Sequence, residues 1–370
     1  MTLTVKHAFT SAIADDPAAS AAGEVLPSHW NASHVVSGLT LRDILTTNRN
    51  YFVSATGSDS NDGLTIGTAW ATLQHAMLFI AGNLDIAGFV VIVNIGAGSF
   101  VGFGALSCVG GGAILFTGAG SASTTITGGA NDGIINFGEC FDADFVPYTL
   151  ISINKVTFQP SAGNYAFAVY VRASAFIGDG AITFSADVKF DISSMNNTSS
   201  VVLSQDVGAE IALQPGPISI SGAGNPLAVF RGSLGGAIVN FSNPAISGGP
   251  TWASGYIVLT EGAQYIEQGN QPTGSATGPR FALSVNSAIV GNSDPAGTFY
   301  PGNAVGTLDR NATYQGITDF TGSVASLPAS VRNAEAFVTD ANSTTFGAIV
   351  AGSGANYVPV YADGTNWRIG

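Results

Sequence analysis

The 370-residue chain is long enough for about two or three domains, yet only 9% of its residues are charged, against about 25% in ordinary globular proteins. It contains 48 glycines, is 46% hydrophobic and has a net charge of −13. Its 11 basic residues are spread thinly, which argues against a nucleic-acid ligand, because phosphate binding needs clustered Lys and Arg. No stretch approaches the roughly 20 consecutive apolar residues that cross a bilayer. The hydrophobicity therefore indicates buried core and subunit contacts, not membrane insertion.

Residues 1–50 form a leader whose mixture of Pro, Ala, Ser and Gly has no sustained period, which predicts irregular or extended structure. Its segment LPSHWNASHVVSG resembles a P-S-x-W-N-x-x-H motif near the N-termini of phage tail and fibre proteins. The residues that carry this resemblance are Pro27, Trp30, Asn31 and His34. The resemblance implies that the leader attaches the chain to a virus particle. The alternative is that these residues pack a loop against the body of the protein.

The stretch from Tyr51 to Ala76 predicts a short strand, a polar turn and an amphipathic helix near 69–81, followed by Gly82 as a C-terminal stop. Apolar residues recur at helical spacing at Trp70, Leu73, Met77 and Ile80. A stack of β coils exposes its first rung, so this helix is expected to cap such a stack. The segment resembles the opening of pectin-lyase-fold β-helix domains in phage tail proteins, which share a G-S-D-S-N-D-G-like loop and an A-x-x-T-[IL]-Q-x-A helix.

From residue 51 to 286, short apolar strands alternate with turns rich in Gly, Asn, Pro and Ser. Four anchor residues are each followed eight residues later by an isoleucine: Val169, Leu203, Phe230 and Val258 precede Ile177, Ile211, Ile238 and Ile266. This recurrence predicts an all-β fold, a right-handed, single-stranded parallel β-helix with coils of about 27 residues. A β-sandwich is the main alternative.

Residues 287–370 predict a β-rich tip, in which Asp363-Gly364 forms the turn of a hairpin. The ending resembles the A-F-V-T-D-A…V-P-V-Y-x-D-G-T-N-W-R-I-G block found on many phage tail and structural proteins. That resemblance implies a terminal module that joins three chains.

Together these resemblances imply a homotrimeric appendage on a phage or phage-like particle, bound through its leader to other virion proteins. Its expected work is adhesion to bacterial surface polysaccharide. A polysaccharide depolymerase, hydrolase or lyase, is the first alternative. A purely structural spike or a connector that carries another receptor-binding protein is the second. All four histidines precede the coils and no G-x-S-x-G elbow is present, which favours binding over catalysis.

Two pairs of carboxylates are the candidate catalytic groups. Superposing the four anchors puts Arg172, Asp206, Ser233 and Glu261 at one offset, so Asp206 and Glu261 are expected two coils apart, about 9.6 Å, as an inverting pair. The alternative is a turn position that prefers polar residues.

Asp142 and Asp144 form the second pair, two residues apart on a predicted strand face, where with Glu139 they could act together or bind Ca²⁺. The alternative is a surface insertion loop. No other metal or cofactor is expected.

Glycan binding without cleavage needs aromatic faces on an exposed ridge. Tyr170, Trp252, Tyr256 and Tyr265, with Arg172 as a basic neighbour, are the candidates, although alternate aromatics must point into the core or a trimer seam.

Overall fold

The computed structural model describes residues 3–5, 14–16, 26–28, 34–36, 42–106, 108–128, 141–144, 150–160, 167–172, 181–185, 187–207, 209–269, 271–291, 299–308, 312–314, 320–327, 330 and 335–370. By its internal contacts the chain separates into two compact units, Met1–Asp43 and Ile44–Gly370.

The first unit contains a small antiparallel sheet, where the sequence predicted irregular or extended chain. Strand β1 (Leu3–Val5) pairs with β2 (His34–Val36), and Val5 lies opposite His34. Both segments are runs rich in β-branched residues, which favour strands even in a sequence without a regular period. Pro27 is half-buried, whereas Trp30 and Asn31 lie outside the described residues.

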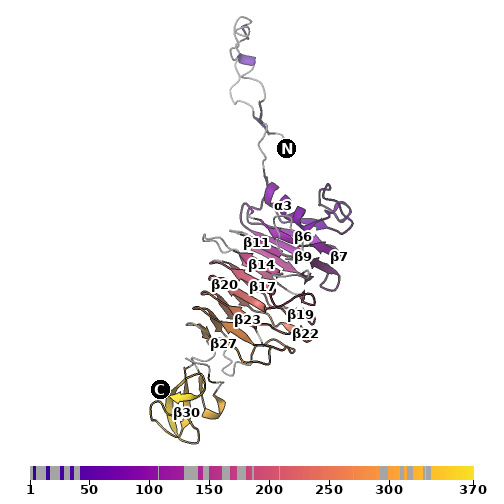
Figure 1. The fold of residues 1–370 in the computed structure, drawn as a ribbon. Helices are drawn as coiled ribbons and strands as arrows, with labels where there is room; N and C mark the ends of the chain where they lie inside the picture. The colour runs from indigo at the N-terminus through magenta and orange to yellow at the C-terminus, as the bar shows by residue number, and fades with distance from the viewer. Residues whose placement is uncertain are drawn as a thin grey trace. The chain divides into compact units, whose positions relative to one another are not determined.

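The second unit is a parallel β-helix built from three long sheets (Figure 1). The ten-stranded sheet consists, in spatial order, of β28 (Thr313–Tyr314), β26 (Ala288–Gly291), β24 (Gln264–Glu267), β21 (Ala237–Asn240), β18 (Glu210–Leu213), β15 (Ala181–Phe184), β12 (Leu150–Asn154), β9 (Ala113–Thr117), β6 (Val90–Ile95) and β4 (Arg49–Val53). The eight-stranded sheet consists of β27 (Thr307–Leu308), β25 (Phe281–Leu283), β23 (Gly255–Leu259), β20 (Ala228–Ser233), β17 (Ser200–Gln205), β14 (Phe167–Arg172), β11 (Phe141–Asp144) and β8 (Phe103–Ala105). The six-stranded sheet consists of β22 (Ala245–Ser247), β19 (Ile218–Ser221), β16 (Val188–Asp191), β13 (Val156–Gln159), β10 (Thr124–Thr127) and β7 (Gly98–Val101).

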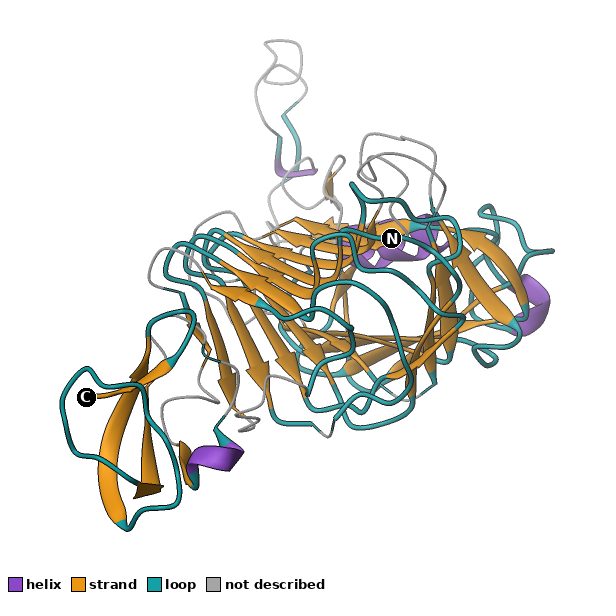
Figure 2. Cartoon of the chain, turned by 60° about the horizontal axis from the view of Figure 1, so that its bottom comes forward, coloured by secondary structure: helices purple, strands orange, loops and turns teal. Residues whose placement is uncertain are grey.

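Successive coils visit the ten-, six- and eight-stranded sheets in that order, as β18, β19 and β20 do, and every pairing within the three sheets is parallel. Figure 2 shows the strands wrapped around a common interior. The predicted parallel β-helix is therefore confirmed. The sandwich is excluded, because its neighbouring strands would run antiparallel.

The register corrects the predicted repeat by one residue in two coils. Val169 pairs with Val202, not Leu203, and Phe230 pairs with Ile257, not Val258. In the ten-stranded sheet, one column of paired residues consists of Ile182, Ile211, Ile238 and Tyr265. The predicted alignment of Ile211 with Ile238 is therefore correct. Tyr265 takes the place predicted for Ile266, and Ile182 the place predicted for Ile177, which lies outside the described residues. Turns of unequal length separate the anchors, and sequence spacing alone cannot reveal where a turn gains a residue.

The coils continue past residue 286, the predicted end of the shaft. Strands β26 and β28 extend the ten-stranded sheet, and β27 pairs with β25 in the eight-stranded sheet. The winding therefore runs at least to Tyr314, and the C-terminal module is shorter than predicted.

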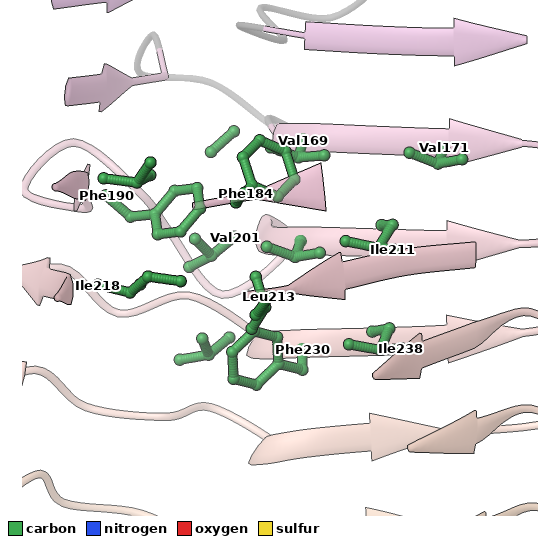
Figure 3. Close-up of a cluster of buried hydrophobic side chains, with 14 of the residues drawn as sticks. Val169, Val171, Phe184, Phe190, Val201, Ile211, Leu213, Ile218, Phe230 and Ile238 are labelled. Atoms are coloured by element: carbon green, nitrogen blue, oxygen red, sulfur yellow. The ribbon is translucent and has the colours of Figure 1, made fainter. Parts of the chain in front are cut away.

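Buried side chains stack from coil to coil along the interior (Figure 3). The valines of β14 point inward, Phe184 and Phe190 pack edge to face, and Ile211 lies directly above Ile238 in register. Each of these side chains is less than 5% exposed. Alternation along each strand buries one face and presents the other outward.

The first coil is covered by helix α3 (Leu73–Asn83), which packs against β4, β8 and β5 (Leu84–Asp85). The helix begins four residues later than predicted, because Thr72 is its N-cap and accepts a hydrogen bond from the His75 N–H at 3.1 Å. Trp70 lies outside the helix: its backbone forms an isolated parallel β-bridge with Val53, and its ring stacks on that of Tyr51 with the centroids 4.8 Å apart. The predicted cap is thus confirmed, with different boundaries.

The C-terminal module is a four-stranded sheet of β29 (Phe320–Gly322), β30 (Glu335–Ala341), β31 (Asn356–Ala362) and β32 (Trp367–Ile369). The predicted hairpin at Asp363-Gly364 joins β31 to β32, and Gly364 has a φ of 94°. In the described residues, no helix is both long and apolar enough to cross a membrane.

Candidate functional site

The outer face of the eight-stranded sheet carries polar side chains from several coils, with the buried Leu203 among them. Val169 and Val171 of β14 point into the core, so Tyr170, which alternates with them, faces outward. In register with Tyr170 lie Leu203 of β17 and Arg231 of β20. A parallel column contains Arg172, Gln205 and Ser233. The spacing between neighbouring positions is about 4.8 Å, that of paired strands.

Part of this face is held in place, and part of it has unused hydrogen-bonding capacity. The Tyr170 hydroxyl donates to Gln205 Oε1 at 2.9 Å, which orients the amide and leaves its Nε2 without a protein acceptor among the described residues. The half-buried guanidinium of Arg231 has neither an ion-pair nor a hydrogen-bond partner within the same residues. Polar groups that are partly removed from water and lack protein partners are suited to a polar ligand.

The backbone places Asp142 and Asp144 on this sheet, not in a surface insertion loop. Both belong to β11, in which Asp142 pairs with Tyr170 and Asp144 with Arg172. The two aspartates are two positions apart in this strand, and their action as a pair remains a prediction. Glu139, their proposed third partner, lies outside the described residues.

Asp206 and Glu261 occupy equivalent turn positions two coils apart, about 10 Å by strand spacing, but Leu234 and not Ser233 lies between them. All three residues have a left-handed backbone: φ is 74° at Asp206, 51° at Leu234 and 56° at Glu261. Val285, the next residue of the column, has a φ of 53°. Leucine and valine occupy the same turn position as the two carboxylates. The four coils therefore share a left-handed turn conformation at this position, not a carboxylate.

Three of the four proposed glycan-binding aromatics are core residues, which corrects the sequence interpretation. Trp252, Tyr256 and Tyr265 are at most 1% exposed. The Trp252 indole donates to the Pro301 carbonyl at 3.0 Å, and Tyr256 and Tyr265 pack on Phe230. Large aromatic side chains fill the wide interior of these coils, so only Tyr170 remains a surface candidate.

Sequence reasoning missed Gln205 and Arg231 as members of this face. The misplaced anchor at Leu203 shifted that coil by one residue, which put Asp206 in the place of Gln205 beside Arg172. Arg231 directly follows the correctly placed anchor Phe230, as Tyr170 follows Val169, so the predicted repeat already contained the signal for it. Among the described side chains, no three His, Cys, Asp or Glu residues cluster as a metal site.

Comparisons with known proteins gave matches among solved structures alone. No protein-family model matches the chain, and no curated protein does. Among solved structures, a pectin methylesterase from carrot is similar with a TM-score of 0.35 and 16% identity, over 72% of this chain and 83% of that one. A pectin methylesterase from Aspergillus niger is similar with a TM-score of 0.33 and 13% identity, over 72% and 86%. The fold assignment rests on the sheet topology of the chain itself.

Proposed function

We propose that this protein is an adhesin on the surface of a phage or phage-like particle, and that its β-helix binds a bacterial surface polysaccharide. The observation that carries the proposal is the outer face of the eight-stranded sheet, where Gln205 Nε2 and the Arg231 guanidinium have no protein partner among the residues that the structure describes. Sugars offer many hydroxyl and carboxylate groups to such donors, and a tyrosine beside them supplies an apolar surface. The viral setting is supported by the sequence resemblances of the leader, the cap and the C-terminal block.

Binding to immobilised bacterial capsular polysaccharides and lipopolysaccharides tests the proposal. Arg231→Ala and Gln205→Ala are each expected to weaken binding about tenfold, because a lost polar contact to a ligand costs about 1–2 kcal/mol. Lys189→Ala is the matched control, since this half-buried lysine lies on β16 of another sheet. Loss of binding in the control, or no loss in the two site variants, contradicts the proposed surface.

A polysaccharide depolymerase is the second candidate, favoured by one observation, the register of Asp142 and Asp144 with Tyr170 and Arg172. A pair of carboxyl groups that flank the scissile bond is the arrangement that glycoside hydrolysis uses. Release of oligosaccharide from the bound glycan, abolished by Asp142→Asn or Asp144→Asn, would replace the adhesin by this enzyme.

The proposed assembly is a homotrimer joined through the C-terminal module. In this module Phe346 is 76% exposed and Tyr357 is 61% exposed. The ring of Tyr357 stacks on that of Phe337, with the ring centroids 5.4 Å apart. Exposed aromatic groups of this kind are typical of subunit contacts. Native mass spectrometry is expected to give three times the chain mass of 37.4 kDa, and a monomer would rule out the trimer.

A further inference from the structure

The interior of the late coils contains a carboxyl group that no surface function explains. Glu267 of β24 is 1% exposed and points inward, directly below Asn240 of β21 in register. The same inward position is Phe184 and then Leu213 in the two preceding coils. An apolar column thus becomes polar at Asn240 and acidic at Glu267.

The carboxyl group of Glu267 accepts every hydrogen bond that it makes with the described residues. Asn240 Nδ2 donates to both carboxyl oxygens, at 2.9 and 3.1 Å, and the Gly269 N–H donates to Oε1 at 2.9 Å. The Tyr265 hydroxyl donates to Oε2 at 3.2 Å. Asn240 is oriented by Ser242, whose N–H and hydroxyl both donate to its Oδ1, so its amide nitrogen faces the carboxyl group.

Within the described part of the chain, nothing of opposite charge balances this group. Among the described residues no lysine, arginine or histidine forms an ion pair with Glu267. The titratable neighbours in this cluster are three tyrosines, Tyr265 on the same strand, Tyr256 of β23 and Tyr300. Burial raises the pKa of the Glu267 carboxyl to about 7, although hydrogen bonds from Asn240, Gly269 and Tyr265 lower it. Burial and the nearby carboxylate raise the pKa values of Tyr256 and Tyr265, so both remain neutral.

The sign of the resulting pH dependence follows from linkage. The unfolded chain releases the proton of Glu267 near pH 4.5, and the folded chain releases it near 7. Between these values the folded state holds more protons, so its stability falls as the pH rises through this window and is lowest above it.

We propose that Glu267 is a pH-dependent latch of the late coils: this buried carboxyl group, which has no opposite charge beside it among the described residues, is protonated in mildly acidic solution and must carry a buried charge in alkaline solution. The buried hydroxyl of Tyr256, which has no hydrogen-bond partner in the described part of the chain, adds a polar group to the same interior. The folded β-helix is therefore more stable in mildly acidic than in alkaline solution.

Urea unfolding of the full-length protein at pH 5, 6, 7 and 8 tests the latch, with Glu267→Gln compared with the wild type. Glutamine preserves the shape but cannot ionise. The ratio of the wild-type to the variant unfolding constant is expected to rise on the order of 10²-fold between pH 5 and 8. Glu261→Gln is the control, because this exposed glutamate lies six residues away and should leave the wild-type profile unchanged. A ratio that stays constant with pH, or an equal change in the control, overturns the proposal.

Tyr265→Phe provides a second test that does not depend on the glutamine variant folding. It removes the hydroxyl that donates to Oε2 and stabilises the charged form. The midpoint of the pH dependence is expected to move upward. An unchanged or lowered midpoint would contradict the latch.

Discussion

At the scale of single residues, Asp363 illustrates how one side chain holds a turn. Its carboxylate accepts hydrogen bonds from the N–H groups of Asn366 and Thr365, each at 2.8 Å, and forms an ion pair with Arg368. The bonds from Asn366, Arg368 and Thr365 lower the pKa of Asp363 to about 2. Because the pKa is depressed, the stabilisation is present above about pH 3.8 and is lost as the pH falls through 2.

Replacement of Arg368 tests this account. Arg368→Gln should move the titration midpoint of Asp363 upward, but only part of the way to 3.8, since the backbone donors remain. The carboxyl carbon chemical shift of Asp363, followed by NMR from pH 1.5 to 6, reports the midpoint. Asp340, another carboxylate of this module, serves as the internal reference. An unchanged midpoint for Asp363 would mean that the ion pair has no influence on its charge.

At the scale of elements, the cap depends on one polar junction between the loop and α3. Asp59 accepts hydrogen bonds from the N–H groups of Ala71 and Thr72 and from the Thr72 hydroxyl, at 2.8, 3.0 and 2.8 Å. Thr72 in turn caps α3. The polar loop therefore sets where the helix begins, which is why the spacing of Trp70 and Leu73 misled the prediction.

Loss of this cap should weaken the first coils. Thr72→Ala is expected to lower the free energy of unfolding by about 1 kcal/mol, because the hydroxyl satisfies a helix N–H that is otherwise unpaired. Thr72→Ser keeps the hydroxyl and should lose much less. Urea denaturation of both variants measures the difference, and equal losses would show that the methyl group, not the hydroxyl, matters.

At the scale of the whole molecule, the boundary between the two units lies after Asp43, not after residue 50. Strand β3 (Asp43–Ile44) pairs with β5, and β4 pairs with β6 from Arg49 onward. A cut at residue 50 would therefore remove the start of the β-helix, which no composition change in the sequence marks.

Two truncations distinguish attachment from folding. Deletion of residues 1–42, which leaves β3 whole, should keep the free energy of unfolding within about 0.5 kcal/mol of the wild type and abolish incorporation into particles, if the leader attaches the chain. Deletion of 1–50 should cost more than about 2 kcal/mol, because β4 loses paired residues next to the core. Incorporation of the shorter deletion into particles would refute the attachment role, which remains a prediction.

The sequence by itself determined the class of fold, because strand periodicity, turn residues and a repeated coil length are local properties that a parallel β-helix preserves. It likewise determined the cap and the final hairpin, each of which is specified within a short segment. The tertiary structure alone decided which face each residue occupies. Turns of unequal length set the register, and a shift of one residue exchanges inside for outside. Trp252, Tyr256 and Tyr265 are therefore core residues, Gln205 lies on the outer face, and Glu267 is buried where the sequence offered no sign of it.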